Sequence, residues 1–88
     1  MTLEELKNSL IDEGFEDAVV FESPDYVSAV IGRTEDGRVI YSYEKMIESL
    51  MSTDGMDREE AMEFIDFNTV RALPYMGEKA PVIMYELI

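Results

Sequence analysis

Cysteine, histidine and tryptophan are missing from the chain, and each absence excludes a kind of chemistry. Without cysteine the protein has neither a disulfide nor a thiol nucleophile. Without cysteine and histidine, a zinc site has lost its usual ligands, and the serine and threonine hydroxyls have no imidazole base to activate them. No glycine-rich phosphate-binding motif is present either. We therefore expect no enzymatic activity, no cofactor and no metal.

Basic residues are scarce as well. Seven Lys and Arg stand against 20 Asp and Glu, which gives a formal net charge of -13. Such a charge repels phosphate backbones and anionic lipids, so we expect no direct binding of nucleic acid or membranes. No stretch approaches the roughly 20 apolar residues of a membrane span, and the amino terminus carries acids where a secretory signal would carry bases. A cytoplasmic location is the resulting expectation.

The apolar content is sufficient for one small hydrophobic core. Of the 88 residues 47% are apolar, and aromatic and branched side chains are well represented, unlike in an acidic disordered tail. A chain of this length typically forms one domain, and no linker or internal repeat divides it. We therefore predict a single folded domain over residues 1–88.

Helices are predicted by capping residues that precede a helical apolar period. Thr2 and Glu5 form a capping box before a helix over 3–13, and Ser42 caps a second helix that ends before Asp54 and Gly55. A second capping box at Asp57 opens a third helix, which Pro74 should stop near residue 72.

Four short runs favour strands. They cover residues 18–22, 26–33, 38–42 and 82–87, with a hairpin turn at 34–37. The last run is apolar on both faces, which is typical of a strand in the interior of a sheet. The predicted fold is α+β in the order α-β-β-β-α-α-β. It has a small antiparallel sheet of about four strands, with three helices mainly on one face.

The negative charge is concentrated in two segments. Residues 1–25 carry a net charge of -7 and residues 48–66 a net charge of -6, whereas residues 26–47 and 67–88 are each neutral. One interpretation is a solvated surface that keeps the protein soluble. The other is a surface that attracts a basic partner and loses affinity with salt.

The third predicted helix carries the candidate partner-binding residues. Glu59, Glu63 and Asp66 share one exposed face at helical spacing. A cation site or an acid-base pair is disfavoured there because neither an oxygen-rich loop nor a desolvated cleft is indicated. Arg71 and Tyr75 are further candidates, since arginine and aromatic residues dominate interface energetics.

Asn68 lies in the apolar stripe of the same predicted helix. A buried amide must be hydrogen-bonded, so we interpret Asn68 as a structural polar residue that bonds to backbone in an adjacent loop or strand end. Contact with a ligand is the alternative.

The same region carries a resemblance. Residues 57–77, ending in FNTVRALPYMG, and then residues 80–83 look like the carboxyl-terminal half of small acidic proteins of Gram-positive gut bacteria and their phages. The resemblance implies a bacterial or phage origin. It implies no activity, because no function is assigned to that group.

Three functional hypotheses follow. The first is a non-catalytic module that binds a protein partner, for which a basic protein is a candidate. The second is an acidic mimic of nucleic acid that inhibits a DNA-handling enzyme. The third is a small ligand-binding protein or enzyme that uses Asn68, Arg71 and Tyr75 in a pocket. A homodimer, formed through a sheet edge or through the methionine-bearing helices, is left open.

Overall fold

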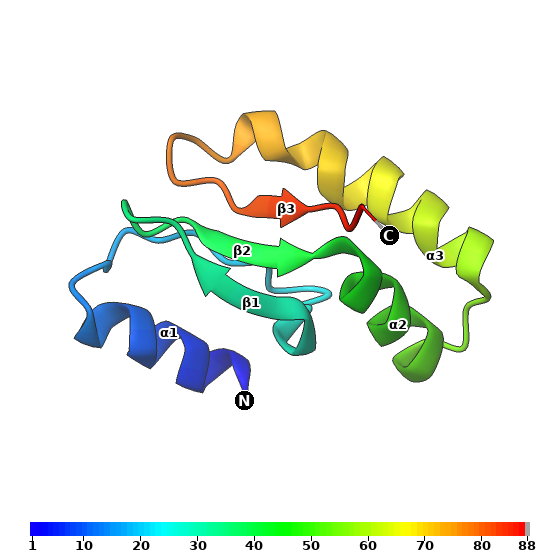
Figure 1. The fold of residues 1–88 in the computed structure, drawn as a ribbon, viewed down its shortest axis with the longest axis horizontal. Helices are drawn as coiled ribbons and strands as arrows, with labels where there is room; N and C mark the ends of the chain where they lie inside the picture. Colours follow the sequence, from blue (N-terminus) through cyan, green and yellow to red (C-terminus); the bar gives the residue numbers. More distant parts are fainter. Residues whose placement is uncertain (88) are drawn as a thin grey trace.

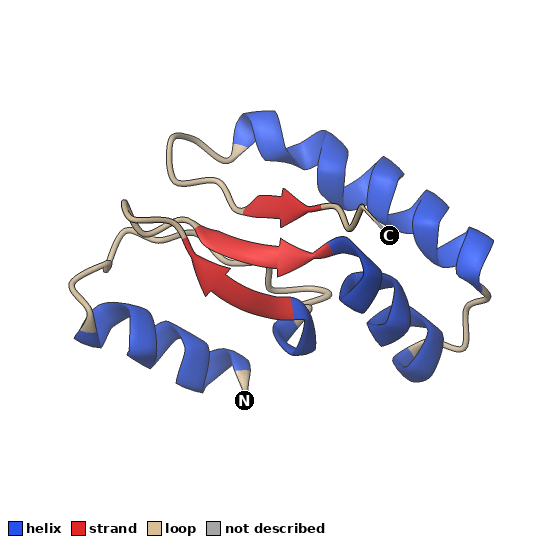
Figure 2. Cartoon of the chain, in the orientation of Figure 1, coloured by secondary structure: helices blue, strands red, loops and turns tan. Residues whose placement is uncertain are grey.

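A computed structural model describes residues 1–87 as an α+β fold with three α-helices and a three-stranded mixed sheet (Figure 1). The α+β class is confirmed, with one strand fewer than predicted. The elements are α1 (Leu3–Asp12), β1 (Val30–Arg33), β2 (Val39–Ser42), α2 (Tyr43–Thr53), α3 (Arg58–Phe64) and β3 (Val82–Met84). Figure 2 shows these elements by type. Within the described residues, no helix combines the length and the apolar character needed to cross a membrane.

The predicted helix starts are confirmed by their caps. The backbone N–H of Glu5 donates to the Thr2 hydroxyl at 3.1 Å, and that of Lys45 donates to the Ser42 hydroxyl at 3.2 Å. At α3 the Asp57 carboxylate accepts from a backbone N–H at 2.9 Å in a complete capping box. Each cap satisfies a donor that the first helical turn leaves without a partner.

The strand predicted over 18–22 is absent. The backbone N–H of Phe21 donates to the hydroxyl of Tyr41 at 3.2 Å rather than to a neighbouring strand. The Phe21 ring packs against the Tyr41 ring at a centroid distance of 4.7 Å. Phe21 is therefore buried, but a side chain takes the place of a strand partner.

Only the second half of the strand predicted over 26–33 forms. Val27–Ala29 is a 3₁₀ turn, and the preceding Tyr26 has a left-handed φ of 50°. The Asp25 carboxylate accepts a hydrogen bond from the N–H of Val27 at 3.0 Å, which fixes this turn locally. The pattern of β-branched and aromatic residues gives no indication of this turn, so the predicted strand was too long.

The sheet differs from the prediction in direction and order. Its order is β1-β2-β3, with β1 antiparallel and β3 parallel to β2. The predicted antiparallel pairing is found between β1 and β2 but not between β2 and β3, which are parallel. The prediction of an interior last strand was wrong, because β3 is at the edge and pairs with β2 alone. The cause lies in the connection. Both α2 and α3 separate β2 from β3, and such a helical crossover returns the chain in the same direction.

The helix that begins at Arg58 continues past its predicted end. A π turn at Ile65–Thr69 follows α3, and a 3₁₀ segment then runs over Val70–Tyr75. Pro74 lies inside that segment instead of stopping the helix near residue 72. Pro74 has no N–H to donate, and the segment closes where the N–H of Met76 donates to the carbonyl of Leu73 at 3.0 Å.

The core lies on one face of the sheet. Val39 and Tyr41 alternate with Ile40 along β2, and both are buried with Leu6 and Leu10 of α1 and with Met46, Ile47 and Leu50 of α2. In Figure 1 no helix passes in front of β2 or β3. The side chain of Ile40, which points away from Val39 and Tyr41, therefore belongs to an open face.

Gly37 is the position at which the fold tolerates no side chain. Its φ is +90°, and an added Cβ would clash with the ring of Phe15. We expect Gly37→Ala to lower the free energy of unfolding by about 3 kcal/mol, because a left-handed alanine and a steric clash each cost roughly 1 to 3 kcal/mol. Urea denaturation monitored by circular dichroism measures the change.

Gly14→Ala is the matched control. Gly14 has the same φ of +90°, but nothing lies within 4 Å of the added Cβ. It should cost about 1 kcal/mol, the strain of the left-handed backbone alone. Equal losses in the two variants would contradict the packing of Phe15 on Gly37.

Candidate functional site

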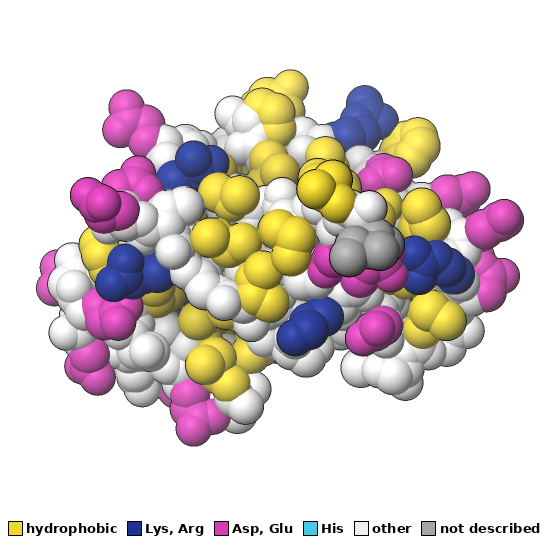
Figure 3. Space-filling view, in the orientation of Figure 1, with side chains coloured by type: hydrophobic (Ala, Val, Ile, Leu, Met, Phe, Trp, Pro, Cys, Tyr) yellow, Lys and Arg dark blue, Asp and Glu magenta, His cyan; other side chains and the backbone are white. Residues whose placement is uncertain are grey.

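The two acidic regions lie apart. α1 and the junction between α2 and α3 are at opposite ends of the long axis of the molecule, whose extent is 38 Å (Figure 1). In Figure 3 acidic side chains gather at both ends of the visible face, and apolar side chains occupy its centre. The charge segments 1–25 and 48–66 therefore do not combine into one anionic face.

The three predicted carboxylates of the third helix have different surroundings. Glu59 and Glu63 are exposed on α3. Asp66 is exposed too, but it accepts a hydrogen bond from the hydroxyl of Tyr43 at 3.2 Å and so connects the π turn to α2. Among the described residues, no group of three or more acidic side chains is arranged to hold a metal ion.

The π turn shifts the register of the predicted apolar stripe by one residue. The N–H of Val70 donates to the carbonyl of Ile65, and the buried position after Ile65 is Thr69 rather than Asn68. The prediction that Asn68 lies in the buried stripe was therefore wrong. Its amide is exposed and donates to the carbonyl of Phe64 at 3.1 Å, so the bond forms within its own helix and not to an adjacent loop or strand end as predicted.

Thr69 is the buried polar group that sequence reasoning missed. Its hydroxyl forms a hydrogen bond with that of Tyr26 at 3.1 Å. This bond joins residues 65–75, the helical segment that continues α3, to the loop before β1. Burial raises the pKa of the Tyr26 phenol, and the bond to Thr69 opposes that rise. Nothing in the sequence pattern predicts the hydrogen bond between Tyr26 and Thr69, because the burial of Thr69 depends on the extra residue in the π turn.

Arg71 and Tyr75 lie on the outer surface of the helical segment together with Phe67. The guanidinium of Arg71 is 5.1 Å from the centre of the Phe67 ring, within cation-π range. Phe67 is 68% exposed and Tyr75 is 90% exposed. We call Phe67, Arg71 and Tyr75 the aromatic patch. Large aromatic side chains so exposed contribute little to the fold of the single chain.

A groove borders the aromatic patch. It has a volume of about 420 Å³ and lies between the loop over residues 20–26 and the helical segment. Asn68, Ala72 and Met76, each next in sequence to a residue of the patch, line one wall, and Phe21 and Tyr26 line the other. Arg71 and Tyr75 do not line it. Of the three residues in the ligand-pocket hypothesis, Asn68 alone lines this groove, so the groove does not bring the three together.

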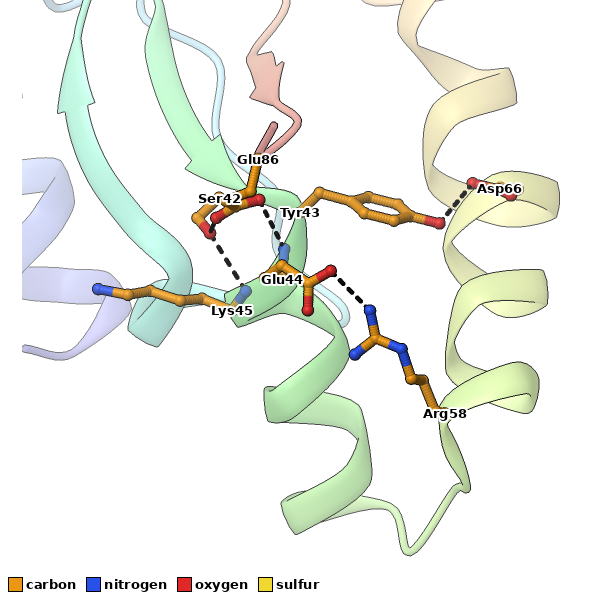
Figure 4. Close-up of polar contacts among 7 residues, drawn as sticks. All are labelled: Ser42, Tyr43, Glu44, Lys45, Arg58, Asp66 and Glu86. Atoms are coloured by element: carbon orange, nitrogen blue, oxygen red, sulfur yellow. Dashed lines mark hydrogen bonds and ion pairs between the residues drawn. The ribbon is translucent and has the colours of Figure 1, made fainter. Parts of the chain in front are cut away.

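A polar cluster ties the end of the chain to the start of α2 (Figure 4). The carboxylate of Glu86 accepts hydrogen bonds from the Ser42 hydroxyl and, at 3.2 Å, from the N–H of Glu44. The Ser42 bond, with help from the backbone of Glu44, holds the pKa of Glu86 below its usual range. Ser42 was predicted as a cap, whereas the part played by Glu86 was not.

The same cluster joins α2 to α3. Arg58 pairs with Glu44 at 2.6 Å, and Tyr43 reaches Asp66 (Figure 4). Burial, reinforced by the nearby Asp66 carboxylate, raises the pKa of Tyr43 to about 12. Within the described residues, every buried side-chain nitrogen and oxygen atom has a hydrogen-bond partner. These groups therefore hold elements together. The predicted candidates Arg71 and Tyr75 are exposed to solvent, and Phe67, which was not predicted, lies beside Arg71.

The pH dependence of stability tests the Glu86 cap. Because the folded-state pKa of Glu86 is lowered, its carboxylate stabilises the fold above the unfolded-state pKa of about 4.3, and this contribution is lost as the pH falls through the folded-state pKa. We expect Glu86→Gln to melt below the wild type at neutral pH, and the difference to shrink on acidification. Melting curves over an acidic pH series measure it.

Glu78→Gln removes the same charge at an exposed residue in the loop before β3. This control variant should melt close to the wild type throughout the series. A Glu86→Gln difference that is independent of pH would be inconsistent with a charged cap.

Comparison with known proteins assigns this arrangement to no family. Protein-family models, curated proteins and solved structures were searched, and none matches the chain. The basis for a proposed function is therefore the chain's own residues and their places in the fold.

Proposed function

We propose that the protein is a non-catalytic binding module that recognises a protein partner through the aromatic patch. The observation that carries the proposal is the exposure of Phe67, whose ring lies beside Arg71, and of Tyr75 four residues after Arg71, at 68% and 90% for the two rings. Aromatic and arginine side chains are the types that dominate binding energy when a partner covers them. Their exposure costs the free protein favourable apolar burial, which a partner restores.

The charge around the patch favours a partner with basic residues. Glu59 and Glu63 are exposed on α3, immediately before the patch in the chain, and residues 48–66 carry a net charge of -6. Such a field attracts a basic surface and speeds association. The neighbouring groove of about 420 Å³ has room for apolar side chains from the same partner. A basic protein with an exposed apolar side chain is the partner that these features fit.

The nucleic-acid mimic is less well supported. A mimic presents a row of carboxylates at phosphate-like spacing, whereas the two acidic regions here lie at opposite ends of the molecule (Figure 1). That hypothesis stays a prediction from the net charge and from the resemblance to proteins of bacteria and phages.

Affinity capture with variants of the patch tests the proposal. A tagged protein carrying Arg71→Ala and Tyr75→Ala should bind the recovered partner about tenfold more weakly or worse, since truncating a central interface residue typically costs about 2 kcal/mol. The partner is then purified and titrated against wild type and variant by calorimetry, at low and at high salt. Binding should weaken as salt rises, because a basic partner is held partly by charge.

The control carries Lys45→Ala and Leu87→Ala. It loses one positive charge and one exposed large apolar side chain, as the patch variant does, but from other parts of the surface. It should bind as the wild type does. Equal affinity of wild type and patch variant for the purified partner would refute a role of the aromatic patch.

A further inference from the structure

The face of the sheet opposite the core is apolar. Along β2 the side chain of Ile40 points away from Val39 and Tyr41, and Val82 and Met84 pair with Ile40 and Ser42 on the same side. The register shift in β1 sets Ile31 and Gly32 together opposite Ile40, because a bulge places two residues against one. We call Ile31, Ile40, Val82 and Met84 the open sheet face.

No helix described in residues 1–87 covers this face, although Glu86, in the segment after β3, covers Ser42 at one end of it. Figure 1 shows no helix in front of β2 or β3, and Figure 3 shows apolar side chains gathered over these strands. Ile31 and Met84 are exposed, and Ile40 and Val82 are half-buried. A sheet face that meets water ordinarily carries polar residues, in alternation with the apolar residues of the core face. The composition of this face is that of a covered surface.

The sequence of the last strand supports the same conclusion. Residues 82–84 are apolar on both sides of β3, a pattern typical of strands that are buried on both faces. In the single chain neither side is fully buried: Ile83 packs against the core and is half-buried, Val82 on the other side is half-buried too, and Met84 is exposed. The apolar residues on the other side have a physical reason only if another surface covers them.

The charge distribution indicates what kind of surface covers these apolar residues. The open sheet face belongs to residues 26–47 and 67–88, each of which has no net charge, and the net charge of -13 resides in the segments outside them. A basic partner is drawn to the acidic ends rather than to this neutral centre. A second copy presents the same neutral, apolar face, and two-fold pairing makes such a face its own complement.

From these observations we infer that the open sheet face is the interface of a homodimer, in which two copies pack sheet against sheet. The charge distribution also sets the crossing. If the 38 Å long axes cross at a wide angle, as in orthogonal sheet packing, the acidic ends of one copy stay away from those of the other. This interface is separate from the aromatic patch and does not depend on the proposed function.

The salt dependence distinguishes self-association from capture of a basic partner. Two copies of charge -13 repel each other, and salt screens that repulsion over a Debye length of about 8 Å at physiological ionic strength. The dimer should therefore be severalfold tighter at high salt than at low salt, whereas a complex with a basic partner loosens. Sedimentation equilibrium over a concentration series at two salt concentrations measures this.

Two methionines provide a matched pair of variants. Met84 is 36% exposed on the open sheet face, and Met51 is 41% exposed on α2, away from the sheet. Met84→Lys should weaken the dimer about tenfold or more, because an ammonium would be buried in both copies. Met51→Lys makes the same change of charge and should leave the dimer unaltered. Ile31→Lys, at a second exposed position of the face, should act as Met84→Lys does. Circular dichroism shows that each variant is folded.

Three results would overturn the inference. The first is a wild-type protein that stays monomeric over the whole concentration series at high salt. The second is an equal effect of Met84→Lys and Met51→Lys on a dimer that does form. The third is a wild-type protein that stays monomeric and binds a purified partner, while the Met84→Lys variant does not bind that partner. The open sheet face would then be the binding site of another protein. Loss of partner binding in the Arg71→Ala, Tyr75→Ala protein has no bearing on these results, so the two proposals fail independently.

Discussion

The phenol of Tyr41 lies at the centre of the core, where its hydroxyl accepts a hydrogen bond from the backbone N–H of Phe21. Tyr41 also pairs with Val30 on one side and with Ile83 on the other, so it fixes the middle strand of the sheet to both neighbours. Burial raises the pKa of its phenol to about 12, with the nearby Asp25 carboxylate adding to the rise and the Phe21 bond opposing it. Because this one side chain holds the segment before β1 against the sheet, that segment needs no strand partner.

Closing the core on one side leaves the other side of a thin sheet uncovered. A chain of 88 residues has helices enough for one face, and α1, α2 and α3 contribute their apolar stripes to a single cluster with Val39 and Tyr41. The apolar residues of the opposite face have no such cover. Small size thus makes an exposed apolar surface hard to avoid, and a second molecule is the usual solution. The neutral charge of the strand segments fits this arrangement, since like copies meet least repulsion there.

The π turn has an equally direct effect on the second surface. One extra residue per turn carries Thr69 into the core and leaves Phe67 and Asn68 outside. The Phe67 ring then lies under the guanidinium of Arg71, and the neighbouring wall of the groove takes Asn68, Ala72 and Met76. Such turns inside helices are frequently found at functional sites. Here the turn decides which face of the helical segment is available to a partner.

The sequence alone determined the α+β class and the starts of the three helices, because capping residues and helical periodicity act over a few neighbours in the chain. It also suggested Arg71 and Tyr75 as candidate partner-binding residues, a prediction that the structure does not test. The tertiary structure decided the direction and position of β3, the loss of the strand at 18–22 and the exchange of Asn68 for Thr69. Each of these depends on a contact between residues far apart in sequence, or on a helical turn whose length periodicity alone does not reveal. Local patterns predict the secondary structure that a segment favours. Packing in the core decides which side of that segment remains exposed to solvent.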